Sequence, residues 1–268
     1  MIKISYRQFI AAVIALIFLL PLVAAIFISL NPVTGADRLS LVSILTQLSW
    51  RNYTELFQVV PFLRYFSNSL LVVILSVPIS ICVSSLGGFY LVRLGQPWRK
   101  WLVGFSIMTM LVPASAVWLL RFQMFSRVGL IDSRLALILP AFAGGSSLFV
   151  LIYFWAWRQA PAELFDAAEI DGANFAQVWW QVALPLVRPA TAAVTLLAFM
   201  LFWGNFIEPV LFIYDPEKYT LPIGLQLLNQ LDASNRPLLL AGAVVAIIPP
   251  LIVFLVAQRW FLQGEWTQ

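Results

Sequence analysis

The chain has 268 residues, of which 62% are hydrophobic and only 10% are charged, and its mean hydropathy is +0.91. Soluble domains carry about 25% charged residues, so this composition excludes a water-soluble globular protein and makes the lipid bilayer the solvent. The formal net charge of +4 reflects membrane topology rather than binding to nucleic acid. The sequence has no histidine and one cysteine, Cys82, so we expect no internal disulfide and no metal site.

Continuous apolar runs of about 20 residues recur along the chain, and helices of that length cross a hydrocarbon core of ~30 Å. The runs do not alternate polar and apolar residues, which argues against the strands of a membrane barrel. We therefore predict an all-α, polytopic membrane protein with six transmembrane helices in a single domain over residues 1–268. The predicted spans are residues 9–30, 70–91, 101–120, 135–157, 190–213 and 238–257.

The orientation of the spans follows from the basic residues near the first two. Lys3 and Arg7 precede the first span, and Arg93, Arg99 and Lys100 lie in the short loop after the second. Lysine and arginine concentrate in cytoplasmic loops, and an even number of spans leaves both ends of the chain on one side. We therefore predict that both termini lie in the cytoplasm.

A stripe of small residues runs along the second span. Ser76, Ser80, Ser84 and Gly88 recur at every fourth position and so share one helix face. Such a face lets another helix approach closely, which favours packing inside the bundle over a substrate path.

The long segment between the fourth and fifth spans, residues 158–189, is predicted to form a helix–turn–helix on the cytoplasmic side. A short acidic helix covers residues 162–170, and Gly172 is free to adopt the left-handed conformation that ends a helix. Asn174 and Gln177 have the spacing of a capping box, which would start a second helix.

The second helix of this segment is predicted to be amphipathic. Phe175, Val178, Trp179 and Val182 fall on one face, and Pro185 is expected to end the helix. The residues alone leave two interpretations open: a solvated amphipathic loop, or a surface that docks on another protein through its acids and its small side chains.

The spacing of this segment resembles the "EAA" loop of the inner-membrane permeases of binding-protein-dependent ABC importers. That pattern is Glu-Ala-Ala, three residues, Gly, nine residues, Ile, one residue and Leu-Pro; here Asp and Val replace the Glu and the Ile. "NSLLVVILSVPISICVSSLGGFYLVRL" and "WGNFIEPVLFIYDPEKYTLPIGL" are also similar to carbohydrate-type permeases. The resemblance assigns the following residues to an ATPase-coupling loop: Glu163, Asp166, Ala167, Ala168, Glu169, Gly172, Ala173, Val182, Leu184 and Pro185.

The resemblance implies a permease subunit that forms half of a pore in a bacterial inner membrane. Its implied partners are a second homologous permease, two cytoplasmic ATPases, an extracytoplasmic solute-binding protein and membrane lipid, with no nucleic acid. No lysine follows a glycine, so the chain lacks the Gly-Lys of a P-loop. We therefore expect no cofactor and no catalysis in this chain, with ATP and Mg²⁺ bound by the partner ATPases.

A candidate substrate path lies in the fifth span, where polar groups are costly unless they serve a function. Its residues are Trp203, Asn205 and Glu208. Their aromatic and amide groups suit a sugar, but Glu208 lies 18 residues from the start of the span, so an outer-interface position stays open.

Two other classes of protein compete with the importer permease. A stand-alone carrier or channel usually shows an ionisable residue near the centre of a span or a pair of broken helices, and the off-centre Glu208 is the one candidate. A membrane-embedded enzyme with paired carboxylates would rest on Asp166 and Glu169, which share a helix face, or on Glu208. Neither has a second supporting cluster in the sequence.

Overall fold

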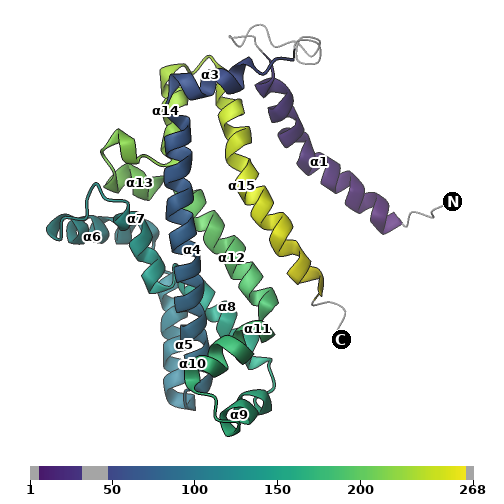
Figure 1. Ribbon diagram of the computed structural model, residues 1–268, viewed down its shortest axis with the longest axis vertical. Coiled ribbons are helices and arrows are strands. Elements are labelled where there is room, and N and C mark those ends of the chain that lie inside the picture. Colours follow the sequence, from purple (N-terminus) through teal and green to yellow (C-terminus); the bar gives the residue numbers. More distant parts are fainter. Residues whose placement is uncertain (1–5, 32–47, 264–268) are drawn as a thin grey trace. The chain divides into compact units, whose positions relative to one another are not determined.

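The structure is a computed structural model that describes residues 6–31 and 48–263, and every element in these ranges is helical (Figure 1). Lys3, one of the basic residues that predict the orientation of the chain, lies outside the described residues. The chain divides into two compact units: residues 1–66 with 221–248, and residues 67–220 with 249–268. The single transmembrane domain stays a prediction.

The first unit contains α1, α3, α14 and the beginnings of α4 and α15. Their bounds are Tyr6–Ser29, Arg51–Val59, Leu221–Leu231, Phe62–Arg93 and Arg236–Gln263. The buried amide of Asn52 on α3 donates to the carbonyls of Ser29 and Asn31, each at 2.8 Å. These bonds satisfy carbonyl groups that the end of α1 leaves without a helical partner.

The second unit contains the rest of α4 and α15 together with twelve shorter elements (Figure 1). These elements are α5 (Gln96–Met110), α6 (Ala114–Arg127), α7 (Leu135–Ile138), η2 (Leu139–Ala143), α8 (Ser147–Arg158), α9 (Glu163–Ile170), α10 (Phe175–Gln177), the π-helix η3 (Val178–Ala183), α11 (Leu184–Leu186), α12 (Arg188–Trp203), α13 (Ile207–Phe212) and η4 (Pro216–Lys218).

Four helical stretches among the described residues are long and apolar enough to cross a membrane: Ile10–Ser29, Phe62–Arg93, Leu135–Arg158 and Arg236–Trp260. Two bent pairs of helices, α5 with α6 and the stretch Phe175–Leu186 with α12, raise the number to six if each pair is one span. The predicted all-α polytopic fold is confirmed.

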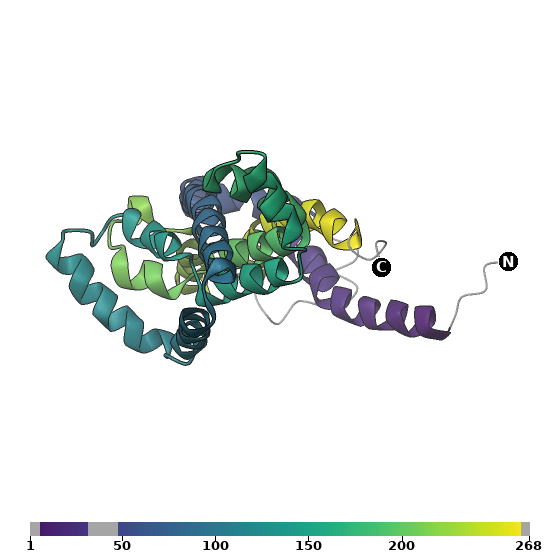
Figure 2. The same ribbon diagram turned by 90° about the horizontal axis from the view of Figure 1, so that it is seen from below.

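The predicted span 101–120 is not one straight helix. It breaks between α5 and α6 at Leu111–Pro113, and the two helices meet at 93° (Figure 2). Pro113 explains the break, because proline has no N–H for a helix to continue through and disfavours helical geometry in the residue before it.

Two further predicted spans are interrupted at glycines. The span 135–157 breaks at Gly144 and Gly145, whose φ angles of +82° and +73° are left-handed. The span 190–213 breaks after Trp203, because α12 is capped at Gly204 and α13 starts at Ile207. An apolar run predicts that a segment lies in the membrane, but it does not predict where the helix breaks.

The small-residue stripe of α4 packs inside the chain, against α8 and the glycine break before it. A Cβ placed on Gly88 would lie 2.7 Å from Cβ of Tyr153 and 2.9 Å from the backbone nitrogen of Phe154. A Cβ on Gly145 would lie 2.8 Å from the hydroxyl of Ser80. The stripe therefore serves helix packing, as predicted.

We expect Gly88→Ala to destabilise the protein by about 1–3 kcal/mol, because the added methyl group overlaps the backbone of α8. Gly87→Ala is the matched control, since its Cβ would lie 3.5 Å from Val150 in ordinary contact, and we expect a change of less than ~1 kcal/mol. Thermal unfolding of the purified variants measures both. Equal shifts would contradict this packing.

Candidate functional site

Helix α9 presents an acidic outer face. Glu163 and Asp166 lie in its first turn, where the positive end of the helix dipole stabilises carboxylates. Both are exposed, as are Ala167 and Glu169, whereas Ala168 is half-buried. The helix begins within one residue of the predicted boundary.

The turn after α9 has the predicted geometry. Gly172 adopts a φ of +87°, and its backbone nitrogen donates to the carbonyl of Glu169 at 3.0 Å. The predicted capping box is confirmed: the backbone nitrogen of Gln177 donates to Oδ1 of Asn174 at 3.0 Å, and the backbone nitrogen of Asn174 donates to Oε1 of Gln177 at 2.8 Å. Ala173 connects the turn to this box.

The second helix of the segment runs through α10, η3 and α11 and is longer than predicted. The expectation that Pro185 ends it is wrong, because the helix continues to Leu186. Pro185 stands in the first turn of α11, directly after the π-helix, where the hydrogen-bond register changes and a missing N–H is tolerated. On the predicted apolar face, Val178 is fully buried and Val182 is half-buried.

A cluster of aromatic side chains holds this segment against α4 and α8. Measured between ring centroids, Phe89 on α4 lies 5.3 Å from Trp157 of α8, 5.7 Å from Phe165 of α9 and 5.3 Å from Phe175 of α10. The indole nitrogen of Trp157 donates to the buried carbonyl of Ala183 at 3.0 Å. These four rings, which we call the Phe89 cluster, were not predicted from the sequence to meet.

Arg93, the last residue of α4, adds a charged contact to the Phe89 cluster. It pairs with Glu169 at 2.6 Å, and its guanidinium lies 4.5 Å from the centre of the Phe89 ring. The acidic helix is thus tied to α4 by charge as well as by packing.

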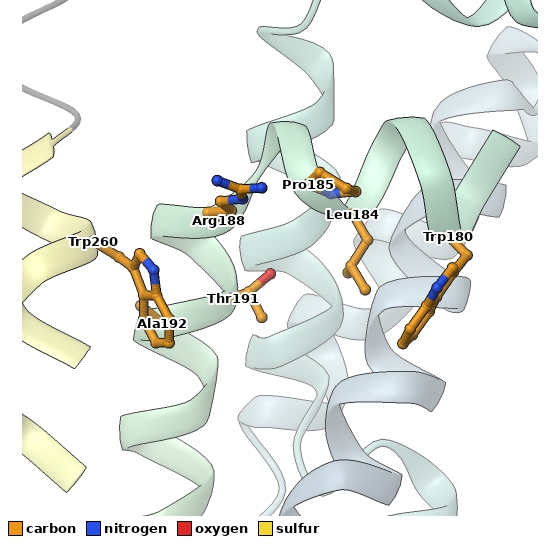
Figure 3. A pocket seen from close by; sticks show the side chains of 7 residues that line it. All are labelled: Trp180, Leu184, Pro185, Arg188, Thr191, Ala192 and Trp260. Atoms are coloured by element: carbon orange, nitrogen blue, oxygen red, sulfur yellow. The ribbon is translucent and has the colours of Figure 1, made fainter. Parts of the chain in front are cut away.

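A pocket of about 430 Å³ lies beside the end of the segment (Figure 3). Leu184 and Pro185 of the predicted coupling loop contribute to it, and Trp180 and Trp260 stand on opposite sides. The pocket is mainly apolar, with Arg188 as its charged residue.

Asn205 and Glu208 of the predicted substrate path lie together at the break between α12 and α13. Glu208 is 9% exposed and forms an ion pair with Arg121 of α6. The amide of Asn205 donates to Oε2 of Glu208 at 3.1 Å, and the backbone nitrogen of Glu208 donates to Oδ1 of Asn205 at 3.3 Å. Glu208 is therefore buried and paired.

These three side chains line a cavity of about 560 Å³, which also contains Trp118. Trp203 is not among its lining residues: it is 6% exposed and stacks on Phe199 at 5.6 Å. Sequence reasoning missed Arg121, although an isolated arginine at the end of a long apolar run was a signal for it.

Loops on the α13 side of the second unit are joined by Asp132, whose φ of +61° is unusual for a residue other than glycine. Its carboxylate accepts from the backbone nitrogens of Tyr214 at 3.0 Å and Asp215 at 2.9 Å, and from Nζ of Lys218 at 3.0 Å. The bond from Asp215 is the main cause that lowers the pKa of Asp132 below its ordinary 3.8.

The family model for the "binding-protein-dependent transport system inner membrane component" matches residues 2–265. The chain belongs to this family. An arabinooligosaccharide transport permease of Halalkalibacterium halodurans is 31% identical to this chain, and the match covers 94% of this chain and 91% of the relative. A lactose transport permease of Rhizobium radiobacter is 29% identical over 74% and 72% of the two chains.

The fold of the permease also matches solved structures. A chain of a bacterial ABC transporter involved in the import of the acidic polysaccharide alginate superposes with a TM-score of 0.77, at 22% identity and with 95% of each chain covered. By its family and its relatives, this permease is a multi-pass inner-membrane subunit of an ABC importer, which works with a solute-binding protein and an ATPase and is not itself an enzyme. Within residues 6–31 and 48–263, no cluster of three or more acidic or cysteine side chains could hold a metal ion.

We expect Arg121→Ala to destabilise the permease by roughly 3 kcal/mol, because it leaves Glu208 buried without a counter-charge. Arg127→Ala is the matched control on the same helix, since Arg127 is exposed and has no ion pair among the described residues. The midpoint of thermal unfolding measures the difference. Comparable midpoints for the two variants would show that the pair is not stabilising.

Proposed function

We propose that this permease forms half of the translocation pore for a sugar or sugar-like solute and transmits ATP-driven motion through α9. The pore would contain a second homologous permease above two cytoplasmic ATPases, which bind the ATP and Mg²⁺. Both termini would lie in the cytoplasm, and the solute-binding protein would deliver its cargo from the opposite side.

The sugar assignment is supported by the relatives. Their names specify arabinooligosaccharides and lactose, and a further relative from Yersinia pestis, 28% identical over 69% of this chain, is named for sn-glycerol-3-phosphate. All three cargoes carry hydroxyl groups, and two of them are uncharged sugars, so a sugar or sugar-like solute fits the set best.

The coupling role is supported by one observation: α9 exposes acidic side chains on one face and is packed into the Phe89 cluster on the other. Glu163 and Asp166 of α9 are exposed, and Ile170 at its end is 86% exposed, which leaves a large apolar side chain for a partner. On the opposite face, Phe165 is buried in the Phe89 cluster. A force applied to α9 would therefore pass to α4 and α8 through packed side chains.

We expect Gly172→Val to reduce both transport and co-isolation of the ATPase. The valine has free space, because nothing lies within 4 Å of its Cβ position, but a φ of +87° strains a branched side chain by about 1–3 kcal/mol. Relief of that strain would turn α9 away from its partner. Uptake of labelled sugar into vesicles and pull-down of the ATPase measure the two effects.

Gly129→Val is the matched control for Gly172→Val, since Gly129 has a φ of +69° and equally open surroundings in a different loop. We expect this variant to retain ATPase co-isolation. Normal uptake and normal pull-down by the Gly172 variant would refute the coupling role of this turn.

The cavity around Asn205 supports a role in the substrate path. A carboxylate, a guanidinium, an amide and an indole face one space of about 560 Å³, and these groups suit the hydroxyls and the apolar faces of a sugar ring. We propose Asn205 and Glu208, with Arg121, as the polar contacts, and assign Trp203 a packing role beside them.

We expect Asn205→Ala to lower sugar uptake by about two- to tenfold, the effect of one lost hydrogen bond. Thr195→Ala is the control on the neighbouring turns of α12, since the Thr195 hydroxyl donates to its own helix, to the carbonyl of Thr191 at 2.7 Å. Initial rates over a range of sugar concentrations measure both. Wild-type rate and affinity for Asn205→Ala would remove it from the path.

A further inference from the structure

A small cavity of about 210 Å³ lies between the beginning of α5 and the end of α8. Its lining residues are Gln96, Arg99, Lys100, Val103, Phe154, Trp155 and Arg158. Three of these are cations drawn from two helices, and none is acidic. We call this space the basic cavity.

The three cations of the basic cavity lack anionic partners within the described parts of the chain. Arg99, Lys100 and Arg158 form none of the ion pairs found there, and the first turn of α5 contains no acidic residue. The guanidinium of Arg158 lies over the ring of Trp155 at 5.0 Å. Three like charges around so small a space repel one another, and an anion placed among them would remove that repulsion.

An apolar groove adjoins the basic cavity along the surface of α5. It measures about 350 Å³ and is lined by Lys100, Trp101, Gly104, Phe105 and Met108, so Lys100 belongs to both spaces. Nothing lies within 4 Å of a Cβ placed on Gly104, and Trp101 and Phe105 are 76% and 61% exposed. This α5 groove is therefore open along its floor and its walls.

We propose that the basic cavity and the α5 groove together bind one anionic phospholipid of the cytoplasmic leaflet. The phosphate lies among Arg99, Lys100 and Arg158, and an acyl chain follows the groove toward Met108. The eight steps along the helix from Lys100 to Met108 span ~12 Å, which suits the upper part of an acyl chain. The choice of leaflet rests on the proposed cytoplasmic position of this end of α5.

Charge complementarity favours a lipid over a protein in this position. A protein partner would have to present an acidic group and an apolar ridge in register, whereas an anionic phospholipid contains both in one molecule. Exposed tryptophans at Trp98 and Trp101 are typical of the membrane–water interface, where phosphates lie. Basic residues beside them attract the anionic lipids of the cytoplasmic leaflet.

Native mass spectrometry of the intact importer, released from nanodiscs of phosphatidylglycerol and phosphatidylcholine, tests the proposal by counting retained lipids. We expect the wild type to retain phosphatidylglycerol, and the triple variant Arg99→Gln, Lys100→Gln, Arg158→Gln to bind it roughly 100-fold more weakly, because each basic residue near the surface contributes roughly a fivefold factor. The double variant Arg188→Gln, Arg259→Gln removes cations near the pocket of Figure 3 and is the control.

Retention by the triple variant, or an equal loss from the control, would overturn the proposal in favour of unspecific charge attraction. Gly104→Trp tests the acyl-chain part with every cation in place, because an indole would fill the α5 groove; we expect it to lose phosphatidylglycerol. Gly95→Trp is its control, at another glycine with open surroundings. Unchanged retention by Gly104→Trp, or a cross-link from Gly104→Cys to the second permease, would show that lipid does not occupy the groove. None of these measurements depends on the transported solute.

Discussion

The packing of aromatic rings around Phe89 determines how the acidic helix α9 is held, because three separate elements meet on that one side chain. Trp157 comes from α8, Phe165 from α9 and Phe175 from α10. Each aromatic pair adds roughly 0.5–1.5 kcal/mol to ordinary burial, and the edge-on orientations of Trp157 and Phe165 fix direction as well as distance. Helix α9 has only eight residues and would be marginal alone, so its position depends on this cluster.

The polar cavity around Glu208 depends on interruptions of the helices. The break at Gly204 turns α13 away from α12, and the break at Pro113 turns α6 away from α5. Arg121 and Glu208 meet because both breaks occur. Irregular backbone within a membrane protein is tolerated where it lines a cavity, and here it does so.

The sequence predicted features that depend on neighbouring residues and missed those that depend on distant ones. Gly172 and the Asn174 capping box were predictable because their hydrogen bonds close within a few positions. Arg121 and Glu208 are 87 positions apart, and no periodicity links them. In the sequence, Phe89 is one of many apolar residues of the second span. Its role as the centre of the cluster follows only from the fold, which brings α8, α9 and α10 against it.

Local signals also failed where two of them conflicted. Pro185 carries the usual mark of a helix end, yet the π-helix before it shifts the hydrogen-bond register so that the proline begins a new turn. Hydropathy located the lipid-soluble segments and placed their ends approximately. The bends within them came from Pro113 and Gly204, whose effect depends on the packing of their surroundings.

Asp132, with its left-handed backbone conformation, organises a loop that a partner protein could recognise. Its carboxylate holds the backbone of Tyr214 and Asp215 and the side chain of Lys218, so this loop is organised before anything binds to it. The hydrogen bonds and the charge of Lys218 lower the pKa of Asp132, and the hydrogen bonds to Asp132 and Asp215 raise the pKa of Lys218, so both groups stay charged at physiological pH. A protein that docks on this loop meets a ready-made surface, and association there costs little conformational entropy at any physiological pH.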